Sequence, residues 1–302
     1  MQNTTEKSSR SAEGLYKFFI YFVLVLLAVT IIVPVAWVFM ASIKQNAEFY
    51  GNPWALPAGF YWQNFVNAWN GAKMGEYMLN SVIVTALALA LLLMLAAAAA
   101  AYFLGCFNGA VIVSKYILRD DVRKHGSGNA GLTNFYRTFG GPLTVVVILT
   151  DVLKAVAAVL VGMVLFRVIG TQAMETAGKY WAGTFCLLGH MFPCMFKFKG
   201  GKGILSGGTI ALMVDWRIAL VVWGGFLVLA ILTKWVSLGS IWAGASFPFA
   251  IWFVCHDLFT LLLAAACGAL VVWKHRGNLK RILAGTESKF SFHRKKEGER
   301  KP

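Results

Sequence analysis

Residues 78–107 read MLNSVIVTALALALLLMLAAAAAAYFLGCF and contain no charged side chain. About 20 helical residues cross the ~30 Å hydrocarbon layer of a bilayer, so this run can span a membrane and tilt or project beyond it. Of the 302 residues, 58% are hydrophobic, above the ~45–50% of soluble domains. The sequence predicts an all-α, multi-pass membrane protein with spans at about 18–42, 78–117, 142–168, 179–196, 204–215, 218–233, 237–252 and 256–273.

The first and fifth spans need comment. The apolar run at 18–40 is too long for a signal-peptide core and lacks a clear A-x-A cleavage site, so we interpret it as a retained transmembrane helix. The span at 204–215 is too short to cross a bilayer alone. We expect it to be half-embedded or continuous with irregular backbone at its start.

The net charge of +15 is compatible with nucleic-acid binding or with an anionic membrane surface and anionic substrates. The lysines and arginines fall between apolar runs, which favours the membrane and argues against a nucleic-acid partner. If the N-terminus is cytoplasmic, the loops on that side hold most of the basic residues and both termini lie inside.

The five cysteines are scattered through apolar surroundings without a C-x-x-C pair. They indicate neither a disulfide framework nor a zinc site, and we expect each to be a small packing residue. No metal ion and no cofactor is predicted.

The first polar segment between spans contains Gly126, Gly128 and Gly131 in the order G-x-G-x-x-G. A transmembrane run precedes it instead of a strand, so it is a weak dinucleotide motif. Glycines still let backbone amides approach an oxyanion, although a solvated positive-inside loop is the alternative. The candidate site residues here are Ser127, Gly128, Asn129, Thr133 and Arg137.

The second segment ends in Gly200-Gly-Lys-Gly203, which resembles a phosphate-binding P-loop but has glycine where Ser or Thr would hold magnesium. We predict that Lys202, with Gly200 and Gly201, clamps an anion. Lys197 and Lys199 are better interpreted as interfacial anchors. For His190, packing and catalysis both remain open.

The third segment places His275 and Asn278 at i and i+3, on one face if the last helix continues. Its alternative is a basic exit segment on anionic lipid. Within the third span, Asp151 and Lys154 are expected to form a structural ion pair, because an unpaired charge there costs ~2.5–3.5 kcal/mol. Charge assigns all three polar segments to the cytoplasmic face, as a site for a phosphate-bearing anion beside lipid.

Over residues 96–289 the chain resembles the bacterial membrane acyl-phosphate:glycerol-3-phosphate acyltransferases. The family motifs are matched in order by Ala101–Gly109, Gly126–Asn134, Asp151–Lys154, Gly189–Pro193, Lys199–Gly203, His275–Asn278 and Gly285–Glu287. The departures, such as Ala155 where glycine is usual, remove no site residue.

The resemblance implies a seven-helix bundle in the bacterial inner membrane with a cytoplasmic active site. It implies acyl phosphate as donor, glycerol 3-phosphate as acceptor, and 1-acylglycerol 3-phosphate (lysophosphatidate) as a phospholipid precursor. The site residues that it implies are Ser127, Arg137, Lys202, His275 and Asn278. We expect Ser127 and Asn278 to orient the hydroxyl or stabilise the oxyanion, and either His275 or a substrate phosphate oxygen to take the proton.

Residues 15–104 resemble the start of carbohydrate ABC-transporter permeases, through Pro34–Lys44, Asn64–Trp69 and Asn80–Thr85. The coupling loop that engages the ATPase of such permeases is missing, so an ABC ATPase partner is not expected. We predict a permease-like segment at 1–95 with one extra helix, an acyltransferase domain at 96–289 and a basic disordered tail at 290–302. A permease subunit and an inactive fusion are the alternatives.

Overall fold

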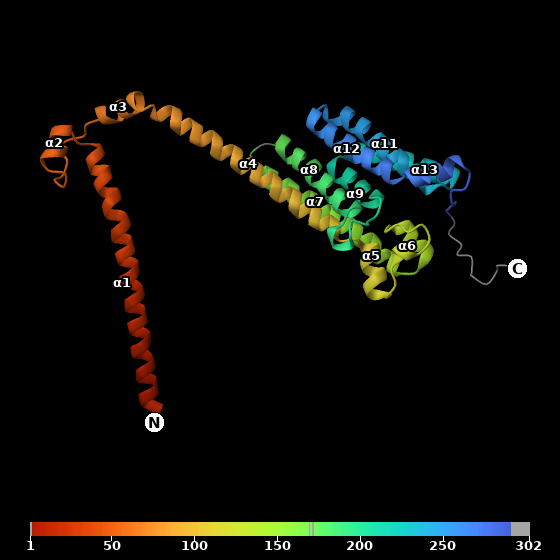
Figure 1. Ribbon diagram of the computed structural model, residues 1–302, viewed down its shortest axis with the longest axis horizontal. Helices are drawn as coiled ribbons and strands as arrows, with labels where there is room; N and C mark the ends of the chain where they lie inside the picture. Colours follow the sequence, from red (N-terminus) through yellow and green to blue (C-terminus); the bar gives the residue numbers. More distant parts are fainter. Residues whose placement is uncertain (1, 169, 171, 291–302) are drawn as a thin grey trace. The chain divides into compact units, whose positions relative to one another are not determined.

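The computed structural model describes residues 2–168, 170 and 172–290, and the regular structure among them is entirely helical (Figure 1). The chain divides into two compact units, residues 1–86 and 87–302, and the division falls inside α4 (Met74–Cys106). Of the predicted tail, residues 291–302 lie outside the described residues. The predicted fold class, an all-α membrane protein, is confirmed.

The first unit contains α1 (Gln2–Ser42), α2 (Asn46–Gly51), α3 (Gln63–Gly71) and the beginning of α4. Its apolar stretch Tyr16–Ser42 is long enough to cross a membrane, and none of it is buried against protein. Exposed apolar side chains of this density are accommodated by lipid.

The segment between α1 and α4 is held by hydrogen bonds from side chains to backbone carbonyl oxygens. Lys44 is buried, and its Nζ donates to the carbonyl oxygens of Asn52 (3.2 Å) and Pro53 (3.0 Å). Asn64 Nδ2 donates to the carbonyl oxygens of Ser42 (2.9 Å) and Lys44 (2.7 Å). These bonds give residues 43–73 a defined conformation despite their short helices.

The second unit begins in α4 and contains, among the described residues, nine further α-helices and three short turns. Its turns are η1 (Val113–Ile117, π-helical), η2 (Val122–Lys124) and η3 (Cys194–Phe196). The helices are α5 (Gly109–Ile112), α6 (Leu132–Thr138), α7 (Leu143–Arg167), α8 (Gln172–Met191), α9 (Ile204–Val214), α10 (Trp216–Thr233), α11 (Val236–Cys255), α12 (Leu258–Lys274) and α13 (Arg276–Leu283). The short helices α5 and α6 belong to the loop that leaves α4.

The eight predicted spans fall on α1, α4 and α7 to α12. Five of these helices, α1, α4, α7, α10 and α11, are long and apolar enough to cross a membrane among the described residues. Helices α12 and α13 pass the same test together, with a bend of 53° between them. Helix α9 has 11 residues, as its short apolar run predicted, and α8 is less apolar than the others.

The second span was predicted too long, because α4 ends at Cys106 and not near residue 117. Asn108 turns the chain there: its Oδ1 accepts from Val111 N (3.1 Å) and its Nδ2 donates to Ala130 O (3.0 Å). A buried amide that caps the following turn and also binds a distant carbonyl stops the helix in an otherwise apolar run.

Glycines let the helices that carry the site approach closely. A Cβ on Gly162 of α7 would lie 2.3 Å from Gly178 O of α8. A Cβ on Gly105 of α4 would lie 2.1 Å from Cys186 O, and one on Gly189 would lie 2.1 Å from Tyr102 O. Small residues at such crossings are typical of membrane helix packing. Gly105 and Gly189 lie near the ends of α4 and α8 that adjoin the polar loops, whereas Gly162 and Gly178 lie near the turn between α7 and α8.

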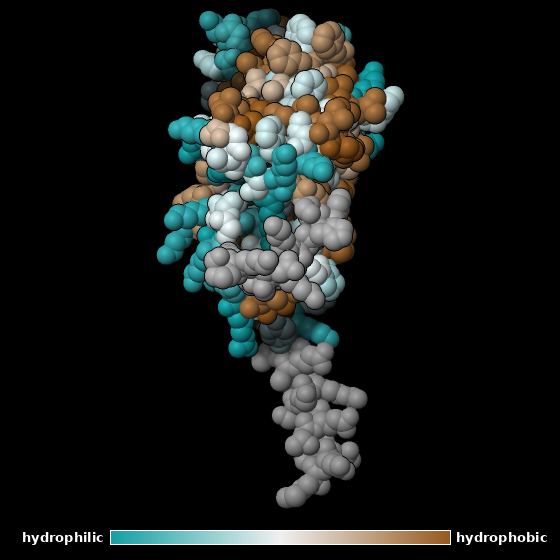
Figure 2. All heavy atoms as spheres, turned by 90° about the vertical axis from the view of Figure 1, so that its right-hand side faces the viewer, coloured by the Kyte–Doolittle hydropathy of each residue, from teal (hydrophilic) through white to brown (hydrophobic). Residues whose placement is uncertain are grey.

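Figure 2 views the molecule from the side that faces right in Figure 1. Hydrophilic side chains (teal) gather over the centre and left of this face, while hydrophobic side chains (brown) occupy its upper part and right.

Candidate functional site

The three polar segments identified in the sequence line a single cavity of about 1150 Å³ in the second unit. One wall comes from the loop before α6, another from the start of α9, and a third from the α12–α13 bend and the residues after α13. Seven predicted site residues line it: Ser127, Asn129, Thr133, Arg137, Lys202, His275 and Asn278.

The glycine-rich loop is organised by Asn134, a buried residue of α6. Its Oδ1 accepts from Ser127 N (3.0 Å), and its Nδ2 faces the carbonyl oxygens of Val122, His125 and Asn129 at 3.0–3.1 Å. Gly126 has φ +55°, and a Cβ there would lie 2.4 Å from Asn134 Oδ1. The loop conformation therefore requires glycine at this position and leaves the Ser127 side chain exposed at the cavity.

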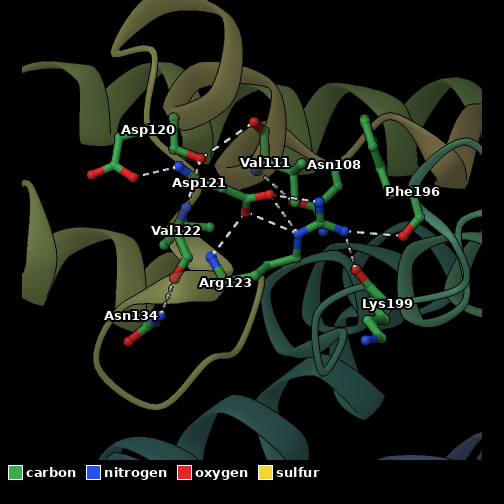
Figure 3. A network of polar contacts seen from close by, with 10 residues as sticks. Asn108, Val111, Asp120, Asp121, Val122, Arg123, Asn134, Phe196 and Lys199 are labelled. Atoms are coloured by element: carbon green, nitrogen blue, oxygen red, sulfur yellow. Dashed lines mark hydrogen bonds and ion pairs between the residues drawn. The ribbon is translucent and has the colours of Figure 1, made fainter.

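Arg123 joins this loop to the segment that precedes α9 (Figure 3). Its guanidinium pairs with Asp121 (2.6 Å) and donates to the carbonyl oxygens of Phe196 (3.0 Å) and Lys199 (3.4 Å). Hydrogen bonding and the charge of Arg123 hold the pKa of Asp121 below its ordinary value. Arg123 therefore links two walls of the cavity through its hydrogen bonds, but it does not itself line the cavity.

Gly200 and Gly201 pack beneath the cavity against His190. A Cβ on Gly200 would lie 2.1 Å from His190 O, and one on Gly201 would lie 2.2 Å from His190 Nε2. Gly201 N also donates to His190 O (3.1 Å). Neither glycine lines the cavity wall, and they allow the backbone approach that sets the position of Lys202.

His190 belongs to a buried charged group below the cavity. Lys154 Nζ lies 2.7 Å from Asp151 Oδ1 and 2.7 Å from His190 Nδ1, and it donates to Phe107 O at 2.9 Å. The predicted Asp151–Lys154 ion pair is confirmed, with both side chains only 3% exposed. Asp151 and His190 also line the cavity. For His190, the sequence alone left packing and catalysis as alternatives.

The third wall is a network centred on Glu287. Its Oε1 accepts from Ser237 Oγ (2.7 Å) and from Asn278 Nδ2 (2.7 Å), while Arg281 Nε donates to Oε2 (2.8 Å). The other end of the Asn278 amide, Oδ1, accepts from Lys202 Nζ. Both ends of Asn278 are therefore occupied, and the residue couples Lys202 to the carboxylate.

His275 lies at the bend between α12 and α13, where it is buried and lines the cavity. Its Nδ1 is 2.8 Å from Val271 O. A carbonyl oxygen can only accept, so this contact assigns the proton to Nδ1 and leaves Nε2 as the basic nitrogen.

The electrostatics of the cavity favour an anion. Burial, reinforced by the nearby cations Arg281 and Arg137, lowers the pKa of Lys202 to about 8. Burial alone would raise the pKa of Glu287, but hydrogen bonds from Ser237, Asn278 and Arg281 outweigh it and lower that pKa. The two carboxylates that line the cavity, Asp151 and Glu287, are each paired with a cation, and Lys202 and Arg137 add two further positive charges.

Several lining residues were not among the predicted site residues. The Gly285–Glu287 turn was part of a matched motif, yet nothing local showed that the carboxylate would face Asn278 and Ser237. Gly128 does not line the cavity. Its φ of +68° allows the backbone of the loop to turn at this position. The unpredicted lining residues include Asp151, His190, Ser237, Ser240, Arg281, Glu287 and Ser288.

A second, apolar cavity of about 50 Å³ lies beside the polar one and shares Gly203 and Ile204 with it. Helices α8 to α12 surround it, with residues such as Leu187, Trp223 and Phe247. The polar cavity can take an anionic group, and the small apolar cavity beside it can take the first carbons of an attached hydrocarbon.

Comparisons with known proteins agree with this geometry. A crystal structure of the integral membrane glycerol 3-phosphate acyltransferase PlsY (YgiH), in its glycerol 3-phosphate form, is 31% identical. It aligns with a TM-score of 0.58 over 66% of this chain and 96% of that one. Its lysophosphatidic acid form aligns with a TM-score of 0.56 at 30% identity, over 66% and 95%.

Among curated proteins, the glycerol-3-phosphate acyltransferase of Thermoanaerobacter pseudethanolicus is 40% identical over 191 residues, which are 63% of this chain and 91% of that protein. A sequence model described as glycerol-3-phosphate acyltransferase matches residues 92–285, and these include every predicted site residue. The chain therefore belongs to the glycerol-3-phosphate acyltransferase family.

Proposed function

We propose that this protein transfers an acyl group from acyl phosphate to glycerol 3-phosphate, giving 1-acylglycerol 3-phosphate and inorganic phosphate for phospholipid synthesis. The observation that carries the proposal is the convergence of three distant polar segments on one cationic cavity, inside the region that matches the family. The apolar cavity that shares Gly203 and Ile204 with it suits an acyl donor with a phosphate head.

The phosphate of glycerol 3-phosphate binds between Arg137 and Lys202, with Thr133 and Asn129 as further donors on the same wall. Charge-assisted hydrogen bonds from arginine and lysine are the strong ones in phosphate recognition. In this arrangement Asn278 and Glu287 act as positioning residues, because Asn278 holds Lys202 and is itself held by Glu287.

The free hydroxyl of glycerol 3-phosphate attacks the carbonyl carbon of acyl phosphate. The new ester C–O bond forms as the bond to phosphate breaks, and inorganic phosphate leaves with the electron pair. Acyl phosphate is a mixed anhydride with a good leaving group, so positioning and charge stabilisation carry much of the barrier reduction. Ser127, exposed on the glycine-rich loop, orients the hydroxyl or donates to the developing oxyanion.

Two groups can take the hydroxyl proton. His275 Nε2 is the basic nitrogen of a ring whose Nδ1 is committed to Val271 O, and a phosphate oxygen of the substrate is the alternative. A His275→Gln variant separates them, because glutamine can still donate a hydrogen bond but cannot act as a base near neutral pH.

The first carbons of the acyl chain enter the apolar cavity between α8 and α12 beside Gly203 and Ile204, which line both cavities. Gly207 lines this cavity, and a Cβ there would meet only Leu187 Cδ1, at 3.7 Å. The glycine leaves room along α9 for hydrocarbon beside the reacting carbonyl.

The proposed setting is the bacterial inner membrane with the cavity on the cytoplasmic face, where positive-inside charge places all three polar segments. Residues 1–95 form the permease-like segment, 96–289 the enzyme domain and 290–302 a basic tail. No nucleic acid, metal ion or ABC ATPase takes part in the proposed reaction. The matched region, residues 92–285, supports the enzyme over the transport-subunit alternative.

The test is an acyl-transfer assay on the purified full chain in lipid, with acyl phosphate and acyl-CoA of the same chain length in parallel. We expect acylation of glycerol 3-phosphate from acyl phosphate and little from acyl-CoA. Equal or faster transfer from acyl-CoA would contradict the proposed donor. No transfer from either, by protein that binds glycerol 3-phosphate, would favour the inactive fusion.

A further inference from the structure

Two cysteines that are 88 residues apart in the chain meet beside the site. Cys106 Sγ, at the end of α4, lies 3.9 Å from Cys194 Sγ in η3. Both residues belong to the second unit. The Tyr102 hydroxyl lies beside both thiols and donates to Phe192 O at 2.8 Å, which holds the segment before η3 against α4.

The two thiols differ in access. Cys194 is exposed, which corrects the expectation that every cysteine would be a packing residue, whereas Cys106 is fully buried. Cys194 lies in the short turn η3 between α8 and α9, with its side chain exposed, and Cys106 is buried next to it. An accessible thiol with a second thiol in reach is the arrangement of reversible thiol oxidation sites.

We propose that Cys106 and Cys194 form a reversible disulfide, with a low-molecular-weight disulfide as oxidant. Cys194, as thiolate, attacks the oxidant and releases one small thiol, which leaves a mixed disulfide on Cys194. Cys106 then loses its proton and attacks Cys194 Sγ, which releases the second small thiol. Two protein thiols are oxidised and one small disulfide is reduced to two thiols.

The required movement is small. A disulfide has an S–S length of about 2.05 Å, so the sulfurs must approach by roughly 2 Å, a distance that side-chain rotation at the exposed Cys194 can supply. The link would fasten the end of α4 to the segment that leads to Lys202. The site is distinct from the substrate cavity, because neither cysteine lines that cavity.

The other cysteines serve as internal references. Cys186 and Cys267 are buried in helices, and Cys267 Sγ donates to Thr184 Oγ1 at 3.4 Å. Cys255 is half-buried, with its Sγ 3.2 Å from the Tyr180 hydroxyl. Oxidation governed by this geometry therefore selects the Cys106–Cys194 pair over these three.

The experiment uses the purified full-length chain in lipid, treated with oxidised glutathione; free thiols are then alkylated and the peptides are mapped by mass spectrometry. We expect a peptide that joins Cys106 to Cys194, formed within a monomer and lost on reduction. Cys194→Ser abolishes the link, and Cys255→Ser leaves it unchanged. The thermal unfolding midpoint of the oxidised wild-type chain is expected to equal or exceed that of the reduced chain.

Glutathione retained on Cys194 without the link to Cys106 would overturn the proposal, as would no modification at either residue. So would preferential linkage of any other cysteine pair. A link that forms but lowers the unfolding midpoint would show that the sulfurs meet only after distortion, and would overturn the placement. These outcomes are independent of the acyltransferase assay.

Discussion

Removal of the Lys202 ammonium tests the proposed phosphate site most directly. Lys202→Ala deletes a cation held by Asn278 at the cavity wall. A hydrogen bond to a charged group contributes roughly 1.5–3 kcal/mol, and each ~1.4 kcal/mol is a factor of ten. We therefore expect kcat/KM for glycerol 3-phosphate to fall by about 10- to 150-fold, and further if the freed Asn278 amide disturbs Glu287.

The matched control is Lys197→Ala. Lys197 is exposed and does not line the cavity, and its replacement removes the same charge from the same segment. We expect less than about a twofold change there, since surface substitutions rarely exceed ±0.5 kcal/mol. Steady-state acyl transfer, normalised to inserted protein, measures both. Equal, mild losses at the two lysines would refute the phosphate site and leave the cluster as an interfacial anchor.

The pH dependence gives the same residue a second readout. A lysine whose pKa is lowered to about 8 is charged below that pH and loses its charge as the pH rises through it. Phosphate binding by the wild type should therefore weaken above about pH 8. Arginine stays charged throughout, so Lys202→Arg should flatten this alkaline limb even if its overall activity is lower. An identical limb in both proteins would assign the titration to another group.

Four further predictions follow from the cavity and the domain split. Glu287→Gln should lower kcat/KM about 10-fold or more, because a charged acceptor of three hydrogen bonds is lost; activity within twofold of wild type would contradict this. Gly207→Phe should raise KM for long-chain but not short-chain acyl phosphates, whereas Gly224→Phe in α10, where an added Cβ would meet no atom within 4 Å, should not. A chelator should leave the activity intact, since both lining carboxylates already pair with cations; a collapse restored by one metal would refute that. A chain that begins at Met78 should insert and remain active; correct insertion without activity would make residues 1–77 part of the enzyme.

Helix content and the positions of the spans were predictable because they depend on local properties. A run such as residues 78–107 is apolar whatever surrounds it, and in lipid its backbone must satisfy its own hydrogen bonds as a helix. The end of that helix was not predictable. Asn108 stops α4 by binding Ala130 O, and apolarity carries no information about a contact 22 residues away.

The motifs also named most of the cavity lining, because lysine and histidine within or beside membrane spans are rare unless they serve a site, and glycines in a polar loop allow close approach of the backbone to an anion. Only the tertiary structure decided what each one does. Gly200 and Gly201 support the backbone on His190 and do not reach the wall, while Asn278 is fixed between Lys202 and Glu287.

The sequence by itself therefore determined the membrane helices, the family and the chemical character of the site, all of which follow from residue types at short spacing. The tertiary structure decided which distant groups meet. The three polar segments form one cavity, and Cys194, which looks like any other scattered cysteine, faces Cys106 across 88 residues of chain. Such contacts depend on how closely α4, α7 and α8 pack, and that packing is a property of the folded chain and not of any one segment.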